Sequence, residues 1–105
     1  MNQDYIHELR DVIRKLHGGD AMHVESVPVQ ESFHGKTIWD GVVEVFDLTG
    51  HPTASRVYAW AHETDDPEHP RRHIAVLHHG PVTSAKKAVQ AAIVQEFKLG
   101  TAEEN

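Results

Sequence analysis

Three runs of alternating polarity and one amphipathic run decide the fold of this chain: TIWDGVVEVFDL (37–48), TASRVYAWAHE (53–63), RRHIAVLHH (71–79) and SAKKAVQAAIVQEF (84–97). Side chains alternate between the two faces of a strand, so the first three runs predict β-strands. The fourth run has apolar residues at helical spacing, at Ala85, Ala88, Val89, Ala92, Ile93 and Phe97, which predicts a helix capped by Thr83 or Ser84.

Two further elements are expected before this stretch. Residues 3–17 carry apolar residues at intervals of three and four and end at Gly18-Gly19, which predicts a helix and its stop. Residues 22–33 alternate well enough for an extended strand, but Pro28 lacks an N–H group. A proline is tolerated at the edge of a sheet or at a break in a strand.

The predicted order is therefore α-β-β-β-β-α, an α+β fold. In a single antiparallel sheet the simplest packing is a two-layer sandwich with both helices on one face. We expect one domain over residues 1–99, with the last helix ending at Gly100 and residues 100–105 forming a flexible tail.

An apolar open sheet face follows from this packing. The alanines of 53–63 suit close helix packing, which sends Tyr58 and Trp60 to the other side of the sheet. The expected open face comprises Ile38, Val42, Phe46, Tyr58 and Trp60. Monomeric proteins rarely leave so large an apolar patch bare. We therefore expect a homodimer, or a protein partner, to cover it.

Composition excludes several classes of function. The 105 residues include no cysteine, which removes disulfides, thiolate metal sites and thiol nucleophiles. No run is long enough for a membrane span and the N-terminus lacks a signal-peptide core. The absence of cysteine favours the reducing cytoplasm, and the general style of the sequence, though no motif, suggests a bacterial type. The net charge of −6 disfavours binding to RNA phosphates.

GPVTSAKKAVQAA (80–92) resembles the entry to the last helix of a double-stranded-RNA-binding domain. That family has the order α-β-β-β-α, and its lysines at this point contact phosphates across the major groove. The resemblance spans roughly residues 42–97 and implies RNA contacts by Ser84, Lys86 and Lys87. Ala85 interrupts the family's Ser-Lys-Lys run, and an extra strand precedes the first matching one. An RNA-binding alternative would also use Arg71 and Arg72.

Ten histidines raise the question of a metal site. Only His69 and His73 have the i, i+4 spacing of a helical metal-binding motif, and Pro70 between them opposes a helix there. One constellation, His62, His73 and His79, could meet across neighbouring strands and is the candidate for a metal or small ligand. Isolated surface imidazoles explain the other histidines.

No catalytic residue or cofactor is expected. Ser84 is explained as a helix cap, no Gly-x-Ser-x-Gly elbow is present, and Gly18-Gly19 follows a helix instead of opening one. The leading hypothesis is a small non-catalytic protein that acts by homodimerisation or partner binding through its open sheet face. RNA binding and ligand or metal binding are the two alternatives.

Overall fold

The structure is a computed structural model that describes residues 3–68 and 70–104, with side chains described up to Gln95. It confirms the α+β class and the order α-β-β-β-β-α. The elements are α1 (Gln3–His17), β1 (Asp20–Phe33), β2 (Lys36–Thr49), β3 (Arg56–Glu63), β4 (Arg71–Leu77) and α2 (Ala85–Glu104). The four strands form one antiparallel sheet in the order β1-β2-β3-β4.

Helix α1 begins and ends where its sequence pattern predicts. Asp4 lies in its first turn, while Arg14, Lys15 and His17 lie in its last, so the charges complement the helix dipole. Gly18 and Gly19 follow with φ angles of +77° and +80°, a conformation that side chains disfavour. The two glycines therefore turn the chain directly from α1 into β1.

The β1–β2 hairpin is long and tightly turned. His34 and Gly35 both have positive φ, 53° and 78°, which is the backbone of a two-residue hairpin turn. β1 forms one edge of the sheet, as Pro28 predicts. Leu48 N–H donates to the Ser55 carbonyl, so even-numbered residues of β2 direct their backbone groups toward β3. Val42 belongs to this set and pairs with Pro28, so the proline nitrogen faces the open edge.

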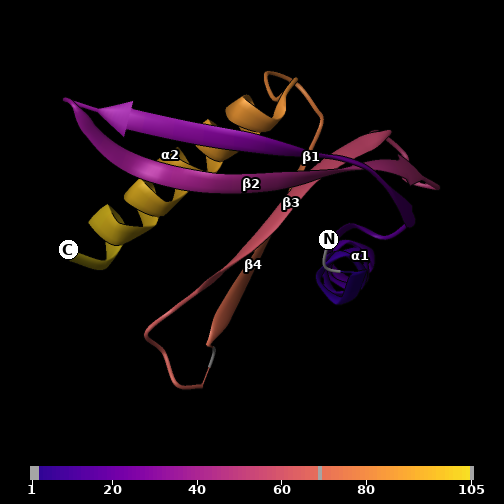
Figure 1. Ribbon diagram of the computed structural model, residues 1–105, viewed down its shortest axis with the longest axis horizontal. Helices are drawn as coiled ribbons and strands as arrows, with labels where there is room; N and C mark the ends of the chain where they lie inside the picture. Colours follow the sequence, from indigo (N-terminus) through magenta and orange to yellow (C-terminus); the bar gives the residue numbers. More distant parts are fainter. Residues whose placement is uncertain (1–2, 69, 105) are drawn as a thin grey trace.

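The two hairpins share only a short ladder. β2 pairs with β3 from Glu44 to Asp47, although β2 begins at Lys36 and β3 continues to Glu63. Beyond this ladder the hairpins diverge, and Figure 1 shows them as the two arms of a V, with α2 crossing the β1–β2 arm and its C-terminal part lying in the opening of the V in this view. We call the space between the diverging inner edges of β2 and β3 the notch.

The helices pack on opposite faces of the sheet, whereas the sequence predicts both on one face. Helix α1 packs on Phe46, Val57 and Ala59, while α2 packs on Val45, Tyr58 and Trp60. Figure 1 shows α1 on the far side of the β3–β4 hairpin from α2. The arrangement has three layers because β2 carries large apolar residues on both faces, and each face needs a cover.

Aromatic residues close the notch from both sides. Trp39 of β2 and Trp60 of β3 meet edge to face, with ring centroids 5.5 Å apart, on the side that α2 covers. On the α1 side, the Tyr5 hydroxyl accepts a hydrogen bond of 2.9 Å from Ala61 N–H. That N–H belongs to the part of β3 that β2 no longer reaches, so Tyr5 replaces a missing ladder partner.

Helix α2 starts as predicted and ends later. Ser84 caps it, since its Oγ accepts from Lys87 N–H at 3.2 Å. Ala85, Ala88 and Val89 are buried against the sheet, and the expected contact of Phe97 lies outside the described side chains. The helix continues through Gly100 to Glu104, so the predicted helix end at Gly100 is wrong. The flexibility predicted for residues 100–105 stays a prediction. An interior glycine costs a helix about 1 kcal/mol and need not stop it.

Candidate functional site

The predicted open apolar face does not exist as one surface. Phe46, Tyr58 and Trp60 are all buried within the chain, at 0%, 3% and 2% exposure. They also lie on different faces, because Phe46 pairs with Val57 under α1 whereas Tyr58 pairs with Val45 under α2. The chain therefore covers these three side chains itself, and the prediction that they form a dimer surface is wrong.

The other two residues of that prediction stay exposed on the β1–β2 hairpin. Ile38 is 49% and Val42 is 46% exposed. Of the seven large hydrophobic side chains found exposed in the described part of the chain, five lie on this hairpin: Met22, Val24, Phe33, Ile38 and Val42. The remaining two are Leu16 on α1 and Val94 on α2. Apolar surface is thus concentrated on one hairpin.

The predicted histidine site does not assemble. His73 pairs with Ala61, while His62 pairs with Arg72, so the two imidazoles belong to opposite faces of the sheet. His79 lies beyond the end of β4 and is exposed. Within residues 3–68 and 70–104, no group of three or more histidine or acidic side chains could hold a metal ion.

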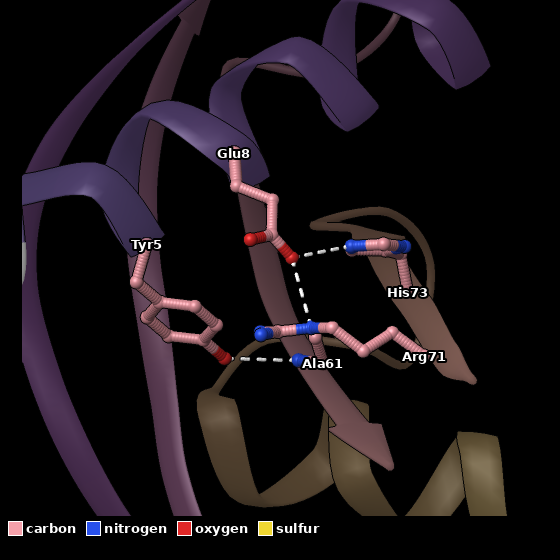
Figure 2. A network of polar contacts seen from close by, with 5 residues as sticks. All are labelled: Tyr5, Glu8, Ala61, Arg71 and His73. Carbon is pink, nitrogen blue, oxygen red and sulfur yellow. Dashed lines mark hydrogen bonds and ion pairs between the residues drawn. The ribbon is translucent and has the colours of Figure 1, made fainter. Parts of the chain in front are cut away.

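One of these histidines joins a different network, shown in Figure 2. Glu8 Oε2 of α1 accepts from His73 Nε2 at 2.6 Å and from Arg71 Nε at 3.1 Å. The Arg71 guanidinium also lies over the Tyr5 ring, 5.5 Å from its centroid. These contacts fasten α1 to the start of β4, and the side chains of Glu8, Arg71 and His73 all remain partly open to solvent.

The basic residues of the RNA-binding alternative fall into two separate groups. Lys86 and Lys87 are exposed in the first turn of α2, next to the Ser84 cap. Arg71 and Arg72 lie at the opposite end of β4 from the connection into α2, about 20 Å away by strand rise. RNA binding stays a prediction, which a mobility-shift assay at low salt tests.

A buried carboxylate on β2 was not anticipated. Glu44 is only 6% exposed and accepts hydrogen bonds from His23 Nε2, at 2.8 Å, and from Ser26 Oγ. His23 packs edge to face on Phe46, beside a bulge in β1. Strand alternation could have indicated this burial, because Glu44 lies on the same face of β2 as Phe46 and Leu48. The polar partners satisfy the charge, so the role of Glu44 is to join β1 and β2 near the notch.

Both tyrosines of the chain make the protein sensitive to alkaline pH. Desolvation raises the pKa of Tyr5 and the pKa of Tyr58 above the ordinary value of 10.0. The unfolded chain then loses these protons first, so stability should fall as pH rises above about 10. Urea unfolding measured from pH 8 to about 10.5 gives the free energy of unfolding at each pH. This free energy should fall less steeply with pH in the double variant Tyr5→Phe, Tyr58→Phe than in the wild type. An unchanged slope would show that other groups govern the alkaline loss.

Comparisons with known proteins found no relative. No family model matches the chain, and neither the curated proteins nor the solved structures contain a match. In the part of the chain that is described, neither helix has the length and apolar run needed to cross a bilayer.

Proposed function

We propose that this chain is a non-catalytic binding protein whose recognition surface is the β1–β2 hairpin, and that a second copy is its first partner. The single observation that carries the proposal is the concentration of five exposed large hydrophobic residues on that hairpin. Isolated exposed hydrophobics are ordinary, but Ile38 and Val42 lie only four residues apart on β2, and neighbouring exposed apolar residues are typical of an interaction site. Self-association through one shared patch gives a closed dimer.

The face of the hairpin serves this contact better than its edge. Pro28 directs its nitrogen toward the open edge of β1 and cannot donate there, so an added strand would meet a gap in its ladder. Val42 pairs with Pro28 across the hairpin, and neither lies in the core cluster beneath α1. The contact is therefore made by side chains along the hairpin, with Ile38 and Val42 as its apolar centre.

Light scattering coupled to size-exclusion chromatography tests this proposal at tens of micromolar protein. We expect a dimer for the wild type and a monomer for the variant Ile38→Ser with Val42→Ser, because about 1–2 kcal/mol of apolar burial is lost at each site in each copy. Val94→Ser is the matched control, since Val94 is equally exposed but lies on α2. A wild-type chain that stays monomeric at this concentration would refute self-association.

A further inference from the structure

A groove of about 750 Å³ lies between the end of α1 and the start of β4. Val12 and Leu16 of α1 line it on one side, and Leu16 is 59% exposed. Arg71 and His73 of β4 line the other side. Its volume falls in the range of small-molecule sites, and it combines an apolar wall with a polar one.

The charge of this groove is opposite to that of the chain. Lys15, Arg71 and Arg72 line it together with the acidic Asp66, and the Glu8 carboxylate beside it pairs with Arg71 and His73. The whole chain carries a net charge of −6. A local excess of cations on an acidic protein attracts an anion to this place and not to the surrounding surface.

The cationic wall is held in position before any ligand arrives. Glu8 binds both Arg71 Nε and His73 Nε2, and the Tyr5 ring supports the Arg71 guanidinium, as Figure 2 shows. Two hydrogen bonds hold the described ends of the loop beside the groove: Thr64 N–H donates to the Pro70 carbonyl and Asp66 N–H donates to Thr64 Oγ1. Preorganised side chains lose less conformational entropy on binding.

We propose that this groove binds a small carboxylate with an apolar body. The carboxylate meets Arg71 and Lys15, whose charge-assisted hydrogen bonds orient it. The apolar body lies along Val12 and Leu16, whose exposed surface it removes from water. The site is separate from the β1–β2 hairpin, so it does not depend on self-association.

Titration of the ¹⁵N-labelled full chain with octanoate, followed by amide chemical shifts, tests the proposal. We expect saturable shifts at α1 and β4 residues that line the groove, with weaker binding of 1-octanol and of inorganic phosphate. Lys15→Gln and Leu16→Ser should each weaken octanoate binding about tenfold. The first variant removes a contact with the carboxylate, and the second removes a contact with the apolar chain. Arg71 is not the residue to change first, because its loss also weakens the attachment of α1.

Two controls keep the outcome specific. Lys36→Gln removes a cation at the tip of the β1–β2 hairpin, and Val94→Ser removes an exposed apolar side chain from α2, so neither should change octanoate affinity. Absence of saturable shifts, equal binding of 1-octanol, equal binding of phosphate, or tighter binding of an RNA oligonucleotide at the same residues would each overturn the proposal. Leu16→Ser should leave the oligomeric state unchanged, which separates this site from the proposed dimer surface.

Discussion

Trp60→Ala is expected to lower the free energy of unfolding by about 3–5 kcal/mol, the usual range for removing a large aromatic core residue. Trp60 is 2% exposed and lies in the core cluster under α2, where it meets Trp39 edge to face. Its loss leaves a cavity in the part of β3 that does not pair with β2, so no β2–β3 hydrogen bonds hold the backbone together there. Chemical denaturation followed by circular dichroism measures the change.

Trp60→Phe separates packing from polarity at the same position. The Trp60 Nε1–H group is buried and has no hydrogen-bond partner among the described residues, which costs stability in the wild type. Phenylalanine keeps a ring against Trp39 and removes this N–H, so we expect a loss of less than about 1.5 kcal/mol. Equal losses for the alanine and phenylalanine variants would contradict the packing role assigned to Trp60.

Gly19→Ala is expected to cost more than about 3 kcal/mol, because two penalties combine. Gly19 has a φ of +80°, which an alanine adopts only with strain. A Cβ atom at this position would also lie 2.5 Å from the Thr49 carbonyl oxygen, a backbone atom at the end of β2. Because Thr49 pairs with Asp20, the clash cannot be relieved without disturbing the first rung of the β1–β2 ladder.

Gly18→Ala is the matched control for this clash. Gly18 has nearly the same φ, +77°, but a Cβ there would meet no atom within 4 Å. The backbone strain alone should cost about 1 kcal/mol. Thermal and urea unfolding of the two variants should therefore differ by about 2 kcal/mol or more; equal stabilities would show that the α1–β1 turn can move away from Thr49.

The elements were predictable because each has a local cause. The spacing of Ile6, Leu9 and Ile13 specifies α1, and Gly18-Gly19 ends it. Pro28 indicated an edge strand, and β1 is at the edge of the sheet. The side chains of Ala59 and Ala61 pack beneath a helix, as their small size predicts.

The placement of the helices was not predictable from alternation alone. Alternation assigns faces within one strand, but the register between strands decides which faces coincide. Grouping Phe46 with Trp60 required a register that the structure does not have, since Phe46 pairs with Val57. Apolar residues on both faces of β2 were the available indication that each side would be covered.

The candidate sites depend on contacts between distant segments. Glu8 and His73 are 65 residues apart, and no spacing rule relates a helix residue to a strand residue at that separation. The groove beside them is formed by the end of α1, the start of β4 and the loop that joins β3 to β4. Ile38 and Val42, in contrast, were identified from alternation in a single strand, and both are exposed.

The notch has a consequence for solubility. Two inner strand edges face each other across it, and unpaired edges of this kind are templates for strand addition by other molecules. Trp39, Trp60 and Tyr5 deny access to those edges in the native chain. A substitution that loosens them would release aggregation-prone backbone before the rest of the chain unfolds, so that precipitation, and not loss of helix content, would be the first sign of damage.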